Sequence, residues 1–368
     1  MSKPRVLVAL SGGVDSSVAA ILLQEQGYDV IGAFLRNGVQ SPPGSCRPRQ
    51  GCCSEADARD AALVADSLGI PFHSLDMESE FIKIQAYFRE SYADGQTPNP
   101  CAVCNRDVKF GALESFADAI GAEFLATGHY ARIATTTSGV TLQRGMDPLK
   151  DQSYVLFPVP ERILARTLLP IGELEKSTTR EIARKAGLRV AEKPDSQEIC
   201  FVPTGDYKDC LLEGGGLGQS GRFLNTSGDV LGEHGGHMGF TRGQRRGLGI
   251  AWKEPLYVLD IDPENGDVRV GTRAETGCTS VQLSALNCFG FRASPGDSMT
   301  GLQVQYRSTP GGARASLEIQ EGNRARVFFD QPADSVNPGQ GIAIYQGDRM
   351  LAGAWIERAE FSFVAPTA

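Results

Sequence analysis

The sequence predicts an α/β protein that opens with a doubly wound parallel sheet and continues with a small β-rich central domain and a C-terminal β-barrel. Strand-like apolar runs alternate with helical segments as far as residue 128. Residues 214–221 are nearly all glycine or small polar residues, which indicates a boundary or loop. Beyond it the pattern changes to short alternating runs that are typical of small barrels.

The first part of the chain has the pattern of successive βα units. Largely apolar runs of strand length predict buried parallel strands at residues 5–10, 29–35, 71–75 and 123–128. Helical spacing predicts helices at residues 16–26, 55–68, 78–92 and 104–120, and residues 161–189 are expected to be mainly helical. A sheet of this kind binds ligands at the carboxyl ends of its strands.

The later part reads as β-structure. Asn265-Gly266 separates two alternating runs and predicts a hairpin. We therefore expect three domains: residues 1–204 with a catalytic sheet and a helical extension, residues 205–276 as the central domain, and residues 277–368 as the barrel.

Composition limits the class of protein. A chain of 368 residues with 41% hydrophobic and 22% charged residues fits a soluble protein of two or three domains. It has neither a signal-like N-terminus nor an apolar stretch of about 18 residues, so a cytoplasmic protein without membrane contact is expected. The net charge of −8 weighs against an extended polyanion partner, although it leaves room for a local basic face. Nine cysteines are too few for a secreted disulfide scaffold.

The strongest local signal is the glycine loop that follows the first strand, Ser11-Gly-Gly-Val-Asp-Ser-Ser17. Glycines let backbone N–H groups approach phosphate, and the next helix adds its positive end. The serine hydroxyls can donate to phosphate, and Asp15 can hold Mg²⁺. The Gly-Lys-Ser/Thr ending of the γ-phosphate-transfer loop is missing. The loop resembles the signature of the PP-loop ATP pyrophosphatases, which split ATP into AMP and pyrophosphate while adenylating an oxygen.

Three cysteines form the second signal: Cys101 and Cys104, at the start of a predicted helix, and Cys200. The helix dipole favours thiolate at such a start. A structural zinc site would need four ligands, and there is no second Cys-x-x-Cys. Thiols that can form a disulfide suit sulfur delivery, in which one carries a persulfide and another resolves it.

With these features the whole chain resembles the tRNA-specific 2-thiouridylases, which install sulfur at the wobble uridine of tRNA. Besides the glycine loop, the resemblance rests on motifs spread along the chain: Thr97-Pro-Asn-Pro100, Cys104-Asn105, Thr127-Gly-His-Tyr-Ala131, Lys150-Asp-Gln-Ser-Tyr154, Asp195-Ser196, Ile199-Cys-Phe201, Thr241-Arg-Gly-Gln-Arg-Arg-Gly-Leu-Gly249 and Pro338-Gly-Gln340. The implied reaction is ATP-dependent 2-thiolation through an adenylated base, and the implied donor is a persulfide source such as a cysteine desulfurase or sulfur carrier.

The resemblance also implies roles for individual residues. Cys104 matches the nucleophile that resolves the persulfide as a disulfide, and Cys200 matches the persulfide carrier. ATP would be bound by Ala9, Leu10, Ser11, Gly12, Gly13, Val14, Asp15, Ser16, Ser17, Leu35 and Gly128. The target base would meet Asn99, Pro100 and Cys101. The anticodon stem-loop would meet Lys150, Asp151, Gln152, His129, Gln340, Gln305 and Tyr306, where Gln305 replaces an arginine of many members.

Cys101 departs from the family pattern, because many members have aspartate there in an acid/base role. An unperturbed thiol has a pKa of about 8.5, against about 3.9 for aspartate. An alternative is that Cys101, Cys104 and Cys200 hold an iron–sulfur cluster with one iron open for sulfide.

Two further segments, one rich in arginine and one rich in cysteine, are weaker indicators of function. Arg242, Arg245 and Arg246 form the densest basic cluster and favour phosphate contact with tRNA. Cys46, Cys52 and Cys53 lie in a long loop with two arginines, and either a lid or a solvated loop fits them.

Two other classes of function remain open. A PP-loop amide ligase would have no use for Cys104 and Cys200. A non-catalytic tRNA-binding module is disfavoured by the intact glycine loop.

Overall fold

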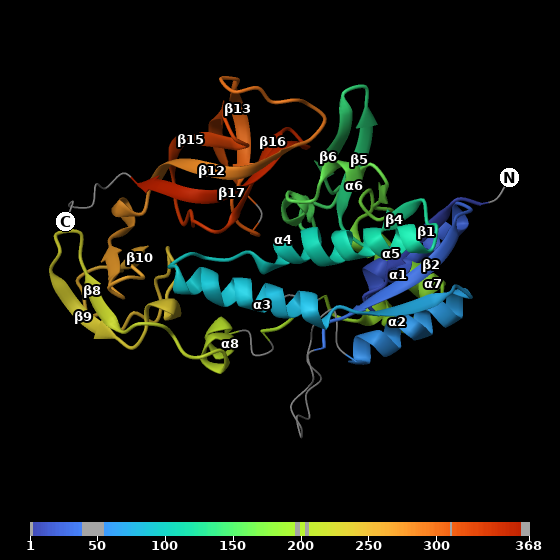
Figure 1. Ribbon diagram of the computed structural model, residues 1–368, viewed down its shortest axis with the longest axis horizontal. Helices are drawn as coiled ribbons and strands as arrows, with labels where there is room; N and C mark the ends of the chain where they lie inside the picture. The colour runs from blue at the N-terminus through green and yellow to red at the C-terminus, as the bar shows by residue number, and fades with distance from the viewer. Residues whose placement is uncertain (1–2, 39–54, 196–198, 203–205, 310, 362–368) are drawn as a thin grey trace.

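The computed structural model describes residues 3–38, 55–195, 199–202, 206–309 and 311–361. These residues form three sheets, and α3 (Glu78–Ala93) runs from the first of them toward the second (Figure 1). The α/β class, the β-rich central part and the closed C-terminal barrel are all confirmed. The three domain boundaries stay a prediction.

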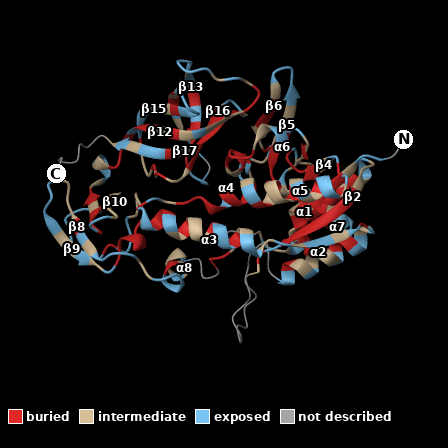
Figure 2. Ribbon diagram, in the orientation of Figure 1, coloured by how far each residue is buried: buried red, intermediate tan, exposed pale blue. Residues whose placement is uncertain are grey.

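The first sheet has five parallel strands in the order β3-β2-β1-β4-β7. They are β1 (Arg5–Ala9), β2 (Asp29–Arg36), β3 (Phe72–Asp76), β4 (Phe124–Ala126) and β7 (Thr167–Leu168). Successive side chains of a strand point to opposite faces. Val6 and Val8 accordingly pack with the residues of α1 (Val14–Glu25) and α2 (Glu55–Leu68), whereas Leu7 packs with α3. The core strands are buried on both faces (Figure 2).

The segment predicted as one helix over residues 104–120 has three parts. A short α-helix, α4 (Pro100–Cys104), leads into π-helical turns at Asn105–Ala112 and then into α5 (Leu113–Ala119). Each π turn holds one more residue than an α turn and so changes which side chains share a face. The helix predicted for residues 161–189 is also broken: α6 (Glu161–Leu164) and α7 (Lys176–Lys185) flank β7.

The central sheet has the order β10-β11-β8-β9. Its strands are β8 (Gly221–Leu224), β9 (Val230–His234), β10 (Tyr257–Ile261) and β11 (Val268–Gly271), and α8 (Tyr207–Glu213) precedes them. β10 and β11 pair antiparallel across Asn265-Gly266, which confirms the predicted hairpin. Gly266 has φ 74°, a conformation that glycine adopts without strain.

The third sheet closes into a barrel because β12 pairs with both β15 and β17. The barrel strands are β12 (Cys278–Cys288), β13 (Ser298–Gln305), β14 (Ala313–Gln320), β15 (Arg324–Ala333), β16 (Gly341–Gln346) and β17 (Arg349–Phe361). A hairpin from the first part of the chain, β5 (Ala131–Thr136) and β6 (Gly139–Arg144), extends this sheet by pairing with β17. The sheet therefore contains strands from two predicted domains.

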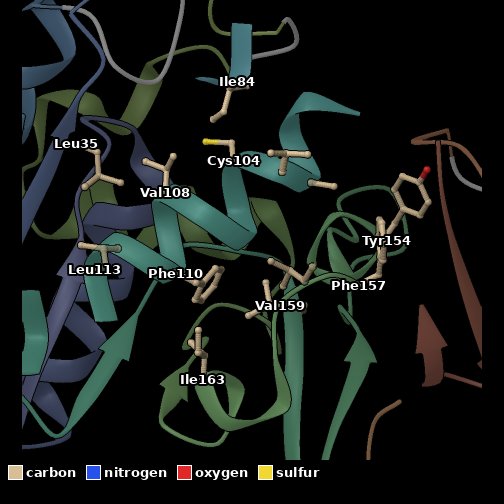
Figure 3. Close-up of a cluster of buried hydrophobic side chains, with 14 of the residues drawn as sticks. Leu35, Ile84, Cys104, Val108, Phe110, Leu113, Tyr154, Phe157, Val159 and Ile163 are labelled. Atoms are coloured by element: carbon tan, nitrogen blue, oxygen red, sulfur yellow. The ribbon is translucent and has the colours of Figure 1, made fainter. Parts of the chain in front are cut away.

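The barrel and the parallel-sheet domain share one hydrophobic cluster. Phe157 packs edge-on against Trp355 with ring centroids 4.9 Å apart. Tyr345, fully buried, also belongs to this cluster, which reaches Cys104 and Val108 at its other side (Figure 3). The central sheet has a separate core.

Candidate active site

The glycine loop lies between β1 and α1, at the carboxyl end of the sheet. Gly12 has φ 70°, and a Cβ there would lie 2.2 Å from the carbonyl oxygen of Asp57, so only glycine fits. Gly13 is the N-cap of α1 and provides no side-chain cap, which leaves the first-turn N–H groups to an anion. Ser16 and Ser17 are buried, and the Ser17 hydroxyl donates to the carbonyl of Gly13 at 2.8 Å. These two hydroxyls therefore brace the loop.

Gly128 follows β4 and Leu35 lies near the end of β2, so the two residues lie on either side of β1 at the carboxyl edge of the sheet. A Cβ on Gly128 would lie 2.5 Å from the backbone nitrogen of Ser16, so this glycine lets the segment after β4 press against the start of α1. Leu35 is buried near the end of β2. Both residues thus border the expected nucleotide site.

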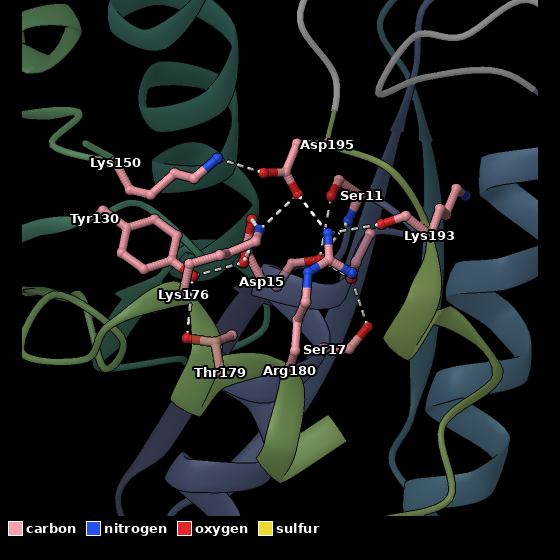
Figure 4. A network of polar contacts seen from close by, with 12 residues as sticks. Ser11, Asp15, Ser17, Tyr130, Lys150, Lys176, Thr179, Arg180, Lys193 and Asp195 are labelled. Carbon is pink, nitrogen blue, oxygen red and sulfur yellow. Dashed lines mark hydrogen bonds and ion pairs between the residues drawn. The ribbon is translucent and has the colours of Figure 1, made fainter. Parts of the chain in front are cut away.

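Asp15 is held by an ion pair that the sequence did not predict (Figure 4). The Lys176 ammonium, at the start of α7, donates to both Asp15 carboxylate oxygens at 2.8 Å. The Tyr130 hydroxyl donates to the same carboxylate at 2.9 Å. The Lys176 side chain is only 11% exposed, so water screens its interaction with Asp15 of the glycine loop only weakly.

Asp195 connects this ion pair to two further cations. It lies 2.7 Å from Lys150, 2.8 Å from Lys176 and 2.9 Å from Arg180. Burial alone would raise the pKa of Asp195, but hydrogen bonds from Lys150 and Lys176 outweigh it and lower that pKa to about 2. The network therefore links the glycine loop, the Lys150 segment and the chain just before Cys200.

A second lysine ties down the outer side of the loop. The Lys193 ammonium donates to the Gly12 carbonyl at 2.8 Å and to the carboxylates of Asp57 and Asp60. Burial opposes its charge, but these two carboxylates prevail and raise the pKa of Lys193. Lys193 thereby holds the backbone of Gly12 in place.

The turn before α4 carries the expected base-contacting residues. Asn99 is buried and caps the helix, since its side-chain oxygen accepts from the Ala102 N–H at 3.1 Å. Its amide nitrogen donates to the Tyr154 hydroxyl at 3.4 Å. Pro100 is buried at the first helical position, and Cys101 is exposed. Asn99 therefore shapes the turn that presents Cys101.

Cys104 and Cys200 belong to one hydrophobic neighbourhood. Cys104 is a buried member of the shared cluster, and half-buried Cys200 packs against that cluster next to buried Phe201. Among the residues that the structure describes, no three His, Cys, Asp or Glu side chains form a group that could hold a metal ion. The iron–sulfur alternative for Cys101, Cys104 and Cys200 stays a prediction.

The residues expected at tRNA are mostly engaged within the protein. Lys150 pairs with Asp195, and Asp151 accepts from Arg144 at 2.7 Å. The Gln152 side chain accepts from the Tyr130 N–H at 3.0 Å. This segment is thus a braced turn, and RNA contact through these side chains would require an exchange of partners.

The remaining expected contacts differ in accessibility. His129 is buried, hydrogen-bonded to Thr127 at 2.7 Å and stacked near Phe110. Gln305 is buried and accepts from Arg144 at 2.9 Å, while Tyr306 packs edge-on against a barrel phenylalanine. Gln340 donates to the carbonyl of Pro98 at 2.7 Å.

The arginine cluster divides into two kinds of residue. Arg242 pairs with Asp260, donates to the Leu259 carbonyl at 3.0 Å and is 17% exposed, so it holds the central sheet. Arg245 and Arg246 are exposed. Cys46, Cys52 and Cys53 lie outside the described residues.

Lys176, Arg180 and Lys193 are the functional candidates that sequence reasoning missed. They lie far along the chain from Gly12 and Asp15, and nothing in their spacing connects them to the glycine loop. The one usable signal was the cluster of cations at residues 176–193 within an otherwise acidic chain.

Comparison with known proteins gives consistent matches along the chain. Family models described as a tRNA methyl transferase HUP domain, a tRNA methyl transferase PRC-barrel domain and an aminomethyltransferase β-barrel domain match residues 4–204, 212–272 and 279–356. A tRNA-specific 2-thiouridylase of Rhodopirellula baltica is 41% identical, with 96% of each chain covered. Those of Paramagnetospirillum magneticum and Acidithiobacillus ferrooxidans are each 44% identical, covering 96% and 98% of this chain and 96% and 100% of theirs.

Proposed function

The chain belongs to the tRNA-specific 2-thiouridylases, enzymes that use ATP to replace O2 of a tRNA uridine with sulfur. On this basis we propose which residues carry out each step of the reaction. The observation that carries the proposal is twofold. Lys176 joins Asp15 of the glycine loop to Asp195, just before the Cys200 segment, and Cys104 and Cys200 pack in one hydrophobic cluster. The uridine is the wobble base, and the reaction takes place in the cytoplasm.

Activation of the base is the task of the glycine loop. The phosphates of ATP, brought with Mg²⁺, bind the first-turn N–H groups of α1. When ATP binds, the Lys176 ammonium exchanges its ion pair with Asp15 for one with the phosphates. The Asp15 carboxylate is then available to the magnesium that accompanies ATP. The flipped uridine attacks the α-phosphate through O2, so that pyrophosphate leaves and the base is adenylated.

Sulfur transfer is the task of the cysteines. A persulfide donor, a cysteine desulfurase or a sulfur carrier, loads Cys200. The terminal persulfide sulfur attacks C2 of the base, and AMP leaves with the C–O bonding electrons. The Cys104 thiolate then attacks Sγ of Cys200, and the S–S bonding electrons pass to the transferred sulfur to give the C2 thiocarbonyl. A Cys104–Cys200 disulfide remains and is reduced by an external thiol.

Serine substitutions test this division. Cys200→Ser is expected to keep tRNA-dependent pyrophosphate release and to lose thiolation in a single-turnover assay on protein pretreated with the persulfide donor. Cys104→Ser should block completion of the transfer. Cys210→Ser is the matched control, because Cys210 packs against the same cluster and should react normally. Thiolation by Cys200→Ser would contradict the assignment of Cys200 as the persulfide carrier.

The cluster alternative has its own test. Protein purified without oxygen is analysed for iron and sulfide before and after Cys101→Ser. Thiolation by iron-free protein supports the persulfide route, whereas joint loss of iron and activity on substitution of Cys101 would establish the cluster.

A further inference from the structure

A cavity lined by arginines lies between the central sheet and the barrel. Its volume is ≈ 350 Å³, and its walls include Arg245, Arg273, Arg307, Thr276 and Asp334. These residues come from four separate segments: the loop before β10, the 3₁₀ turn before β12, the chain after β13 and the chain after β15. The fold therefore gathers cations that are far apart in the sequence.

The charge of this cavity is unbalanced. Three guanidinium groups face one carboxylate, and Asp334 is already engaged by the Thr276 hydroxyl at 2.9 Å and by Arg273 at 3.6 Å. Within the described part of the chain, neither Arg245 nor Arg307 makes an ion pair. Guanidinium groups bind phosphate through paired N–H donors, so such a cavity suits an anion.

A second cavity adjoins the first, since Arg245 lines both. It has a volume of ≈ 450 Å³, and its lining includes Trp252, Lys253 and Glu254. Trp252 is 45% exposed, so its indole is open to a ligand. An exposed indole beside cations is the combination that binds single-stranded nucleic acid, with the base stacked on the ring and the backbone held by charge.

The loop that carries Arg245 is held against the barrel. Gly243 has φ 81°, and a Cβ there would lie 2.5 Å from the Ser335 hydroxyl oxygen. The Gly243 N–H donates to the Val258 carbonyl at 2.8 Å. Ser335 itself has φ 57°, a left-handed conformation that is uncommon for serine. The cavity wall is thus built by close contacts between the two domains.

We propose that the two cavities form one binding site for a strand of the tRNA substrate, apart from the glycine loop. A backbone phosphate lies among Arg245, Arg273 and Arg307, and a neighbouring base stacks on Trp252. The proposal rests on tRNA being the substrate, and it adds a second point of attachment that fixes the RNA relative to the active site.

The salt dependence of tRNA binding tests the site. Affinity for an unmodified transcript of a tRNA with a wobble uridine is measured across a salt series. The double variant Arg273→Gln/Arg307→Gln should bind on the order of tenfold or more weakly and lower the slope of log K against log salt by about 1, since one phosphate contact is lost. Trp252→Ala should weaken binding roughly tenfold without changing the slope.

Arg292→Gln is the matched control, because this exposed arginine lies beyond the opposite end of β12. At saturating tRNA, pyrophosphate release by Arg292→Gln should match that of wild type. Slopes and affinities equal to those of Arg292→Gln would overturn the proposed strand site. Absence of tRNA-dependent pyrophosphate release in the wild type would instead refute the proposed function.

Discussion

At the scale of single residues, the Lys176 ammonium neutralises the Asp15 carboxylate in the glycine loop. It is nearly buried and divides its ammonium between Asp15 and Asp195, so nucleotide binding must redistribute these contacts. Sequence reasoning found Asp15 from its place in the loop motif. It could not find Lys176, because their contact joins residues 161 positions apart and leaves no local pattern.

We expect Lys176→Met to slow tRNA-dependent pyrophosphate release by on the order of 100-fold, because a preorganised cation near the phosphates is removed. Lys176→Arg should retain part of the rate. Lys185→Met, which removes an exposed lysine at the end of α7, is the control and should match wild type. Rates are measured by pyrophosphate release in a single turnover. An unchanged rate in Lys176→Met would contradict the assigned role.

Thiol reactivity is a second property set by single residues. Burial raises the pKa of Cys278 to about 12, and burial together with the Glu161 charge raises that of Cys288 to about 11. A thiol with a raised pKa stays neutral up to a higher pH. Both thiols are therefore neutral and unreactive at pH 8.

Exposed Cys101 should therefore be alkylated by iodoacetamide at pH 8 well before Cys278 and Cys288. Mass spectrometry of timed samples measures the order, and the denatured protein, in which the thiols react alike, is the control. Early labelling of Cys278 in native protein would show that the barrel interior opens.

At the scale of elements, the site depends on close contacts between the ends of strands and the start of α1. Sequence patterns found every strand of the parallel sheet except β7, which has only two residues. They missed the β5–β6 hairpin, although residues 131–144 alternate around Ser138-Gly139. They also could not predict the π-helical turns after Cys104, since these arise from tertiary packing.

Gly128→Ala tests the contact at the start of α1. Its Cβ would lie 2.5 Å from the Ser16 nitrogen and 2.6 Å from the Asp15 carbonyl carbon, so α1 must shift. Overpacking of this kind typically costs about 1–3 kcal/mol. We expect a lower melting temperature and a clear loss of ATP affinity in calorimetric titration.

The control for this variant is Gly235→Ala, where a Cβ meets nothing within 4 Å. Wild-type ATP affinity in Gly128→Ala would mean that the glycine loop binds nucleotide without this support.

At the scale of the whole molecule, the barrel and the parallel-sheet domain are one cooperative body, because they share a hydrophobic cluster and a sheet. The α/β class and the two β-rich parts were correctly predicted from the sequence. The shared core of the barrel and the parallel-sheet domain was not predicted, because it depends on long-range contacts. One example is the contact between Tyr345 and Ser153, whose hydroxyls lie 2.9 Å apart.

Tyr345→Ala should destabilise both parts together by about 3–5 kcal/mol, the usual range for removing a buried aromatic side chain. Hydrogen exchange followed by mass spectrometry is expected to show faster exchange in β1 and β4 as well as in β16. Val268→Ala, in the separate core of the central sheet, is the comparison and should leave those strands protected. An effect of Tyr345→Ala confined to the barrel would contradict a shared unfolding unit.

The contact between Gln340 and Pro98 couples the barrel to the turn that presents Cys101. The loop before β16 reaches across to the turn that presents Cys101, through Gln340 to Pro98 and through the Thr97 N–H to the Pro338 carbonyl at 2.9 Å. An RNA that shifts this loop must shift the turn as well. We therefore expect the loop before β16 and the turn that presents Cys101 to move together when tRNA binds.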